Sequence, residues 1–499
     1  MVVNKKTKVL LVFPPNWSAC VNSPHLALPL LAGQLPENSN FTLLDLNQTF
    51  YKKYNTAPSP EDVSNSSEAR DVDKLNEIYL KWSEPYEDLA KDHNHSFGLI
   101  SGFTNGSFNA LNTNELYENV KNGTVFTDFY HDNLLSFLKN DSFNVILLTC
   151  ASKNQYPALL EIIYILKINF PSTKIIVGGN YITRLKGRES LKQLLKLVDN
   201  IVLYQGEEII RNLFTNFKNG NIINQDHIKI NEWNSPSFNG INWELFPSIQ
   251  KLVPIIGNRG CYYGKCSFCT IPYAWSSNGM GGVLSDELLL AQIKHLKESE
   301  ANDCFKFIDE SFPLKRINNI LDSGINIRWE AYCKVEKEWE DIDFARKAYS
   351  AGCRKIYFGL ELLKSKNSSL LNKNNIGDMD IILENCNDAG IKVHLFTLLG
   401  YPGTTIEDAE NVIQYLVDNA QYIDTSDISG FRLEKQNLDN VNIIRTSDLE
   451  LSYEFNSKKD DILDSKAIIE LEKQAIDFIW EKSPLQIHPL YRIGTKWNY

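Results

Sequence analysis

The feature that most constrains this chain is a short cysteine-rich loop, VPIIGNRGCYYGKCSFCTIP, at residues 253–272. It places Cys261, Cys266 and Cys269 directly after an apolar run that predicts a buried strand. The loop also contains three glycines, Gly257, Gly260 and Gly264. A backbone without Cβ atoms can wrap closely around a bound group. Gaps of four and two residues let the three thiolates converge on one inorganic centre.

The number of ligands indicates which inorganic centre this loop can hold. A structural zinc site closes its tetrahedron with a fourth Cys or His, and the next His after Cys269 is His295, inside a predicted amphipathic helix. The zinc interpretation is therefore disfavoured. A [4Fe-4S] cluster held by three thiolates leaves one iron open to bind another molecule, which suits catalysis better than simple electron transfer.

The loop resembles the signature of the radical S-adenosylmethionine (SAM) superfamily, C-x3-C-x2-C with an aromatic residue, here Phe268, before the last cysteine. This chain has one residue more in the first gap, C-x4-C-x2-C, a variant that occurs among members with an N-terminal cobalamin-binding domain. The resemblance implies a [4Fe-4S] cluster, S-adenosyl-L-methionine bound to its open iron, and an electron donor such as flavodoxin or ferredoxin. One electron from the cluster then breaks a carbon-sulfur bond and releases a 5'-deoxyadenosyl radical.

Length and charge bound the remaining possibilities. A chain of 499 residues, 43% of them hydrophobic, predicts two to four domains with ample cores. A net charge of -11 without a long basic run argues against a nucleic-acid partner. With neither a secretory signal before the first strand nor an apolar stretch of about 20 residues, we expect no export and no membrane span. The other six cysteines are scattered, which is typical of a protein of the reducing cytoplasm.

Residues 1–220 predict a doubly wound, flavodoxin-like parallel sheet. Apolar runs typical of buried parallel strands alternate with helical patterns. The strands are expected at 8–15, 41–46, 144–150, 174–177 and 200–204, and the helices at 25–35, 156–168, 189–197 and 207–217. A polar stretch at about 49–140 interrupts the alternation. We interpret it as an insertion that packs beside the α/β core or over its ligand-binding face.

The loops of this domain resemble those of the cobalamin-binding-like domain that precedes many radical SAM enzymes. The resemblance implies cobalamin contacts from Ser152 and Gln155 after the third strand, Gly178 and Gly179 after the fourth, and Gly206 after the fifth. The motif D-x-H-x-x-G, whose His ligates cobalt from below in that family, is absent. Two alternatives follow: cobalamin binds without a protein ligand below cobalt, or the domain has lost cobalamin and supports the rest of the chain. A Gly-Gly turn by itself is weak evidence, since any αβ connection can use one.

After a linker at 221–252, residues 253–433 predict an incomplete (β/α)6 barrel whose active face lies at the carboxyl ends of its strands. The six strands are expected at 252–256, 304–309, 326–333, 355–361, 392–399 and 427–433, with helices between them. Residues 434–499 predict a C-terminal α+β segment with an amphipathic helix at 463–482. In resembling proteins such a segment covers the open barrel and helps to define the substrate pocket.

Residues at the strand ends extend the resemblance to the SAM site. The segment after the second barrel strand, which resembles the family segment that receives the methionine amino group, consists of Asp309, Glu310 and Ser311. Glu361 closes the fourth strand, where the family contacts ribose or carboxylate. Gly400 matches the family's turn near the adenine, and Phe268 is expected to pack on the adenine. Taken singly, each acidic residue could equally be a helix cap or a salt-bridge partner.

We therefore expect a cobalamin-dependent radical SAM methyltransferase that acts on an unactivated carbon of a peptide or small natural product. One SAM would methylate cobalt, and a second would supply the radical. The alternative is a cobalamin-independent radical SAM enzyme that catalyses a rearrangement, cyclisation or oxidation. A non-catalytic iron-sulfur carrier is a third reading, although carriers rarely need a barrel with polar strand ends. The sequence assigns no general base or nucleophile.

Overall fold

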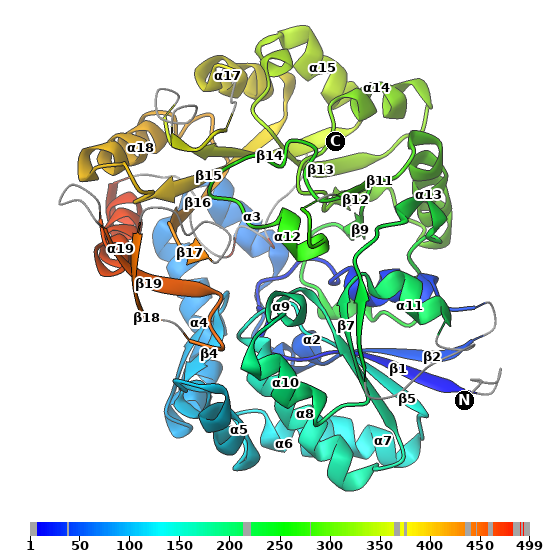
Figure 1. Cartoon of the computed structure of the whole chain (residues 1–499). Coiled ribbons are helices and arrows are strands. Elements are labelled where there is room, and N and C mark those ends of the chain that lie inside the picture. Colours follow the sequence, from blue (N-terminus) through cyan, green and yellow to red (C-terminus); the bar gives the residue numbers. More distant parts are fainter. Residues whose placement is uncertain are drawn as a thin grey trace.

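The computed structural model describes residues 7–36, 39–212, 221–279, 281–363, 370–373, 377–434, 441–445, 447–457 and 463–482, with Leu490 and Ile493. Two six-stranded parallel sheets occupy the lower and upper halves of the molecule, with the short helix α12 (Pro272–Trp275) between them (Figure 1). No helix among the described residues combines the length and the apolarity that crossing a membrane requires.

The N-terminal sheet has the order β2-β1-β5-β6-β7-β8, and all its neighbouring strands are parallel. Its strands are β1 (Lys8–Phe13), β2 (Asn40–Asp45), β5 (Val145–Thr149), β6 (Lys174–Gly178), β7 (Asn200–Tyr204) and β8 (Asn221–Gln225). The first five confirm the predicted flavodoxin-like order. The sixth, β8, lies in the stretch expected to be linker. Strand order reverses between β1 and β5, and ligands of such sheets bind at the carboxyl ends beside this switch point.

Alternation along the strands explains why helices cover both faces of this sheet. In β1, Leu10 and Val12 point to one face and Leu11 and Phe13 to the other, as the two-residue period of a strand requires. The first face packs on α8 (Gln155–Asn169), whereas the second packs on α1 (Ala27–Gly33) and α11 (Gly206–Asn212). The short helices α9 (Asn180–Arg184) and α10 (Glu189–Leu195) join β6 to β7.

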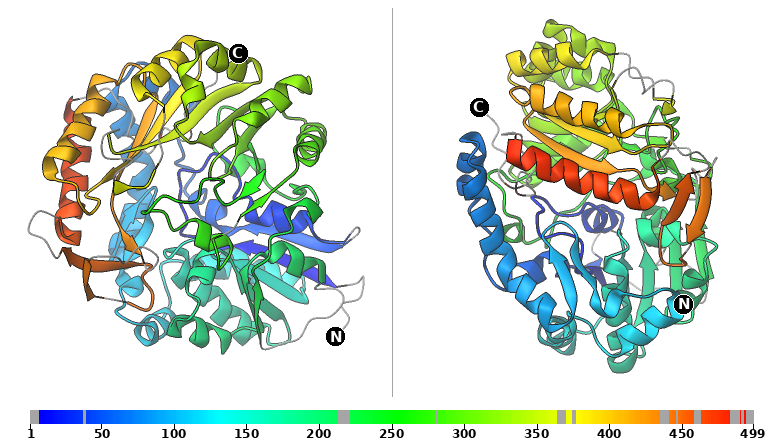
Figure 2. Two further views of the ribbon diagram at one scale, coloured as in Figure 1. Left: turned by 45° about the horizontal axis from the view of Figure 1, so that its top comes forward. Right: turned by 90° about the vertical axis from the view of Figure 1, so that its left-hand side faces the viewer.

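The polar insertion is mostly helical and packs beside the core, on the α8 side of the sheet. Its elements are α2 (Leu46–Tyr51), α3 (Pro60–Glu68), α4 (Val72–Asp92), the hairpin β3 (His95–Gly98) and β4 (Gly102–Asn105), α5 (Thr113–Lys121), α6 (Thr127–Phe129), a π-helix (Tyr130–Leu135) and α7 (Ser136–Asn140). Trp82, Tyr86 and Phe126 bury their rings in the same apolar cluster as the sheet. The long helix α4 forms one edge of the molecule (Figure 2).

The second sheet has the order β16-β15-β14-β13-β12-β9, again entirely parallel. Its strands are β9 (Val253–Ile255), β12 (Cys304–Phe307), β13 (Arg328–Cys333), β14 (Cys353–Glu361), β15 (Lys392–Leu399) and β16 (Thr425–Gly430). The helices between them are α13 (Asp286–Ser299), α14 (Lys315–Asp322), α15 (Ile342–Ser350), α17 (Met379–Ala389) and α18 (Ile406–Asp418). Because β9 and β16 are the two ends of the sheet, this is the predicted incomplete (β/α)6 barrel.

The C-terminal segment is α+β, as predicted. The helix α19 (Ser465–Lys482) packs against the edge strand β16 and against α18. A small antiparallel sheet, β17 (Leu433–Glu434), β19 (Ser452–Ser457) and β18 (Val441–Arg445), lies beside the insertion. Figure 2 shows α19 and this sheet on the same side of the molecule as α4. The C-terminal segment thus lies next to the insertion.

Candidate active site

The cysteine loop begins at the carboxyl end of β9, as predicted, and runs through β10 (Asn258–Arg259) to α12. Cys261, Cys266 and Cys269 are all partly buried. Burial raises the pKa of Cys266 to about 11 and that of Cys269 to about 12, and Cys261 adds to both shifts. The three thiols are therefore close enough to interact electrostatically. Gly260 and Gly264 make the turns of the loop, with φ of 82° and 61°, which glycine adopts without steric cost.

The three thiols fit the ligand set of a [4Fe-4S] cluster. Among the described residues, no group of three or more His, Cys, Asp or Glu side chains is gathered so as to hold one metal ion. In a [4Fe-4S] cluster each thiolate binds a different iron, so three neighbouring thiols need not converge on one atom. Lys373 and Lys334 favour the charged form of Cys266, which fits a thiolate ligand.

A second segment, residues 370–373, holds the cysteine loop in place and was missed in the sequence. The amide of Ser267 donates to the carbonyl of Leu371 at 2.9 Å, and the hydroxyl of Ser267 donates to that of Leu370 at 3.0 Å. Asn372 donates to the carbonyl of Lys265 at 2.9 Å. These bonds link the loop to a stretch more than 100 residues away in sequence. No local sequence motif indicates that residues 370–373 contact the cysteine loop.

Glu361 lies at the carboxyl end of β14 in a conformation that implies functional constraint. Its φ of 60° lies in the left-handed region, which is uncommon for a residue other than glycine, and β14 shifts register with β15 at this point. Its carboxylate is 2.9 Å from Nζ of Lys373, which also donates to the carbonyl of Gly359 at 2.6 Å. Lys373 therefore connects Glu361 to the segment that holds the cysteine loop.

The three residues after β12 have different surroundings. Asp309 is fully buried, accepts the amide of Gly257 at 2.9 Å and faces Arg316 at 3.3 Å. Its carboxylate thus already holds the base of the cysteine loop. Glu310 accepts a hydrogen bond from Nε1 of Trp275 at 3.1 Å. Burial raises the pKa of Glu310 to about 7 despite this bond, so a cation beside it would restore its charge. Ser311 is buried near Tyr262.

Phe268 and Gly400 both lie beside one apolar cluster, which includes Ile468. Phe268 packs against an apolar cluster that includes Leu398, Phe431 and Phe455. Gly400 has φ of 71°, and a Cβ there would lie 2.5 Å from Ile468 of α19. The hydroxyl of the next residue, Tyr401, donates to Ser267 at 3.0 Å. The turn after β15 is thereby joined to the cysteine loop.

The N-terminal sheet carries an apolar cavity of about 230 Å³ at the carboxyl ends of its strands. Gly178, Gly179 and Gly206 line it, as do residues of α1 and α11. Gly179 has φ of 111°, and a Cβ there would lie 2.4 Å from the carbonyl of Cys150. The cavity is also lined from the barrel side by Ile256, Arg259, Trp275 and Ile308. The first three of these flank the cysteine loop and Ile308 follows β12, so the two halves of the molecule share this cavity.

Ser152 and Gln155 lie beside the cavity rather than in its wall. Gln155 is fully buried, accepts the amide of Ala151 at 2.9 Å and donates to the carbonyl of Pro14 at 2.8 Å. It therefore fixes the loop after β5 to the loop after β1. The hydroxyl of Ser152 is buried without a hydrogen-bond partner among the described residues.

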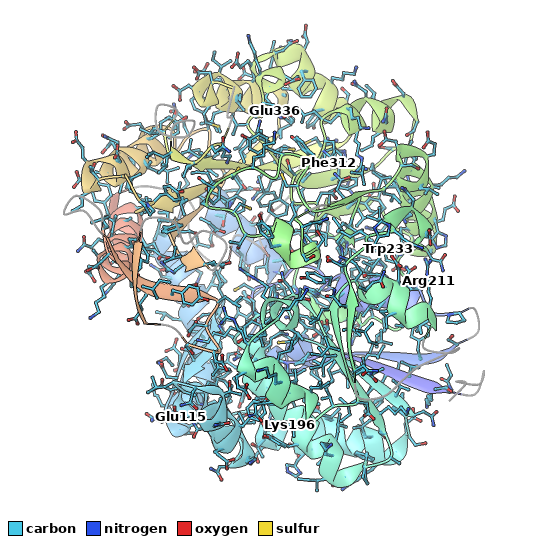
Figure 3. The ribbon with its side chains drawn as sticks, viewed as in Figure 1. Glu115, Lys196, Arg211, Trp233, Phe312 and Glu336 are labelled. Carbon is cyan, nitrogen blue, oxygen red and sulfur yellow. The ribbon has the colours of Figure 1, made fainter. Side chains whose placement is uncertain are left out.

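Arg259 joins the two halves and was not identified from the sequence. Its guanidinium is ion-paired with Glu207 and lies 3.3 Å from Oε1 of Gln205. It also lies over the rings of Trp233 and Trp275, at 5.1 and 4.5 Å from their centroids. Figure 3 shows Trp233 between the upper and lower halves. The only sequence signal is position, because Arg259 stands two residues before Cys261.

Residues 255–416 match the family model of the radical SAM superfamily. A curated relative, bacteriochlorophyllide d C-8(2)-methyltransferase of Chlorobaculum tepidum, is 26% identical over 183 residues, which cover 34% of this chain. The match spans 40% of the length of that relative.

Two solved structures of TsrM, a radical SAM methyltransferase from Kitasatospora setae, share the fold. The structure with cobalamin and a [4Fe-4S] cluster bound has a TM-score of 0.57 at 13% identity, covering 95% of this chain and 88% of its own. The structure with tryptophan and the SAM analogue aza-SAM has a TM-score of 0.54 at 15% identity, covering 86% and 74%. The likeness thus extends over both halves of the molecule.

Proposed function

We propose that this protein is a cobalamin-dependent radical SAM methyltransferase, because residues 255–416 match the family model of the radical SAM superfamily. Cys261, Cys266 and Cys269 would hold the cluster, and the cavity lined by Gly178, Gly179 and Gly206 would receive part of the corrinoid. When bound, the cluster supplies the electron that splits SAM and the corrinoid carries a methyl group. The relatives named above are methyltransferases, which supports this assignment.

One observation carries the proposal: the apolar cavity of the N-terminal sheet is completed by residues on either side of the cysteine loop. Ile256 and Arg259 precede Cys261, and Trp275 follows Cys269. A ligand in the cavity would therefore lie next to the cluster-binding loop. Methyl transfer initiated by a radical needs this arrangement, because both cofactors must reach the same substrate carbon.

The size of the cavity fits one arm of a corrinoid rather than the whole ring. Pockets for drug-sized ligands measure about 300–1,000 Å³, and this one measures about 230 Å³. Its lining is mainly aliphatic, with Leu11, Leu147 and Ile176 from the sheet. Such a slot would suit the flat aromatic base at the end of the cobalamin side arm.

The residues of the chain have separate tasks in this scheme. Glu310 offers a buried carboxylate at the strand end, where an ammonium group would find an acceptor. Lys373 fixes the orientation of Glu361 beside the loop. Asp309 and Arg316 hold the loop from below, at Gly257. Trp275 and Phe268 shield the two sides of the loop from water.

The test uses protein purified and reconstituted with iron and sulfide without oxygen. Hydroxocobalamin added to it should give a saturable change in the visible spectrum, and reductant with SAM should give 5'-deoxyadenosine and S-adenosylhomocysteine. In Gly206→Leu, the new side chain would fill the cavity, because a Cβ at this position already lies 3.1 Å from Leu31. This variant should lose corrinoid binding and keep its iron. Ile168→Leu, at a position 78% exposed on α8, is the matched control.

Two results would contradict the proposal in different ways. If the protein with a complete cluster cleaves SAM but does not bind hydroxocobalamin, it is a cobalamin-independent radical SAM enzyme. Protein that binds the corrinoid equally well with Leu at position 206 would place the corrinoid elsewhere.

A further inference from the structure

The structure contains a second, larger cavity of about 470 Å³, which we call the insertion cavity. Its walls come from parts of the chain that are distant in sequence: the insertion, the loop after β5 with the start of α8, α9, the end of β16, the C-terminal sheet with the segment before β19, and α19. Representative lining residues are Phe103, Phe108, Tyr156, Phe431, Tyr453 and Phe455. This volume lies within the range of about 300–1,000 Å³ of small-molecule sites.

The insertion cavity adjoins the carboxyl ends of strands in both sheets. Lys153 and Asn154 follow β5, next to the switch point of the N-terminal sheet, and Phe431 and Arg432 follow β16 of the barrel. These are the edges at which parallel sheets and barrels bind their ligands. A molecule in this cavity would lie beside both cofactor edges.

The cavity also shares a wall with the cysteine loop. Phe431 and Leu433 belong to the apolar cluster on which Phe268 packs. The next residue, Glu434, is ion-paired with Arg184 and accepts a hydrogen bond from Thr270, the residue after Cys269. The strand β17 therefore contributes to the wall of the cavity through Leu433 and is bonded to the cluster-binding loop through Glu434.

Specific hydrogen bonds hold the walls of the insertion cavity in place. Residues 447–451, which form one wall, are fastened to the N-terminal half: Asp448 accepts hydrogen bonds from Thr113 and from the amide of Ser190, both at 3.0 Å. The hydroxyl of Tyr181 donates to the carbonyl of Leu449 at 2.5 Å. Asn105, another lining residue, has φ of 64° and ψ of -149°, a strained conformation for a residue other than glycine. Such strain is typical of binding sites.

The chemistry of the lining defines the class of ligand. The lining carries two cations, Lys153 and Arg432, and two carboxylates, Glu450 and Glu454. Lys153 is paired with Glu450, and Arg432 is paired with Glu472, which lies outside the lining. The charged groups thus offer no unbalanced charge to a ligand. What remains is a set of aromatic rings, with the hydroxyl and amide groups of residues such as Thr104, Asn109 and Ser452. Aromatic rings bind flat apolar groups, and hydroxyl and amide groups orient uncharged polar ones.

We propose that the insertion cavity is the substrate site and that it takes an uncharged small molecule with an aromatic ring and hydrogen-bonding groups. The identification of this ligand as the substrate rests on the function proposed above. The insertion and the C-terminal sheet would then set the specificity of the enzyme.

The test uses N-acetyl-L-phenylalaninamide as an uncharged aromatic probe, with the cluster-reconstituted protein and ligand-observed NMR or calorimetry. Ala110→Trp and Ser452→Trp each fill the cavity from a different wall. We expect the probe to bind saturably to the wild type, at least fivefold more tightly than the anion N-acetyl-L-phenylalanine. Each filling variant should weaken binding at least tenfold. Leu80→Trp, at a position 59% exposed on α4, should bind as the wild type does.

The inference is overturned if the wild type does not bind the amide, if the anion binds equally well, or if both filling variants bind as the wild type does. Iron content and SAM cleavage without substrate are measured on the same samples. If the protein binds the probe but has neither iron nor SAM cleavage, the proposed function is wrong and the binding site stands. If the protein holds iron and cleaves SAM but does not bind the probe, the site is wrong and the proposed function stands.

Discussion

Arg259, two residues before Cys261, is ion-paired with Glu207 of the N-terminal half, and the side chains are 9% and 5% exposed. The pair therefore lies at the junction of the cavity of the N-terminal sheet and the cysteine loop, with both of its charges removed from water. A buried pair of this kind contributes little net stability, yet it is costly to break on one side only. Its role in this molecule is to hold the two halves in register.

The first prediction concerns this pair. Arg259→Met and Glu207→Met should each lower the free energy of unfolding by about 3–5 kcal/mol, because each leaves an uncompensated buried charge. The double variant should lose less than the sum of the two. Urea unfolding of the four proteins measures the coupling. Losses that simply add would show that the pair does not act as a unit.

The second prediction concerns the cluster ligands. Alanine at position 261, 266 or 269 should leave the protein folded but without its full complement of about four iron and four sulfide per chain. Cys386→Ala, which alters a buried thiol on α17, should retain the cluster. Iron and sulfide analysis after reconstitution checks this. Full iron content in any one of the three variants would remove that cysteine from the ligand set.

The third prediction separates SAM binding from cluster assembly. In Lys373→Met, Glu361 loses the ammonium group that orients it at 2.9 Å. A hydrogen bond to a charged group contributes about 1.5–3 kcal/mol, so the dissociation constant for SAM should rise about tenfold or more. Iron content should stay at the wild-type level. Lys265→Met, at an exposed position in the cysteine loop, is the control. Unchanged SAM affinity in Lys373→Met would assign the lysine a purely structural role.

The fourth prediction is a pH dependence at the base of the barrel. Burial alone would raise the pKa of Asp424, but Lys355 and Lys392 lower it from 3.8 to about 2. Because the folded pKa is depressed, the ionised carboxylate stabilises the fold above about pH 4, and this contribution of about 2 kcal/mol is lost as the pH falls toward 2. Lys355 lies 2.7 Å from Asp424 and is fully buried.

Lys355→Met should therefore destabilise the protein at pH 7. The difference in free energy of unfolding between the variant and the wild type should become smaller between about pH 4 and pH 2. Urea titrations across this range measure it, with the exposed Lys347→Met as the control. A difference in free energy of unfolding that does not change with pH would show that Lys355 does not stabilise the ionised form of Asp424.

The strands and helices were largely predictable because parallel strands buried on both faces leave apolar runs that alternate with helical patterns. The strand β8 was missed for a physical reason. Its sequence, NIINQ, sits at the edge of the sheet and is mostly exposed, so it lacks that apolar run. The insertion could be recognised as a departure from the pattern. Its hairpin and its contact with the C-terminal sheet depend on tertiary packing, which no local pattern records.

The site was predictable where its residues are close in sequence. The spacing of Cys261, Cys266 and Cys269 indicated the loop, and the glycines after the strands indicated the cavity. Residues whose role depends on partners far away in the sequence were not identified from the sequence. Lys373 is more than 100 positions from the loop it supports, and Arg184 meets Glu434 from the other half of the molecule. Asp309 was expected near the ligand, and the structure shows it already bonded to Gly257 and Arg316.

The cavity of the N-terminal sheet is lined by Ile256, Arg259 and Trp275, which flank the cysteine loop, so a corrinoid bound there should lie beside the cluster. Electron paramagnetic resonance of protein loaded with cob(II)alamin and a reduced cluster measures this proximity. We expect a cobalt signal broadened by coupling to the cluster spin, and a sharp signal in Cys266→Ala. A bound corrinoid whose signal stays sharp beside a fully reduced cluster would contradict the proposed function.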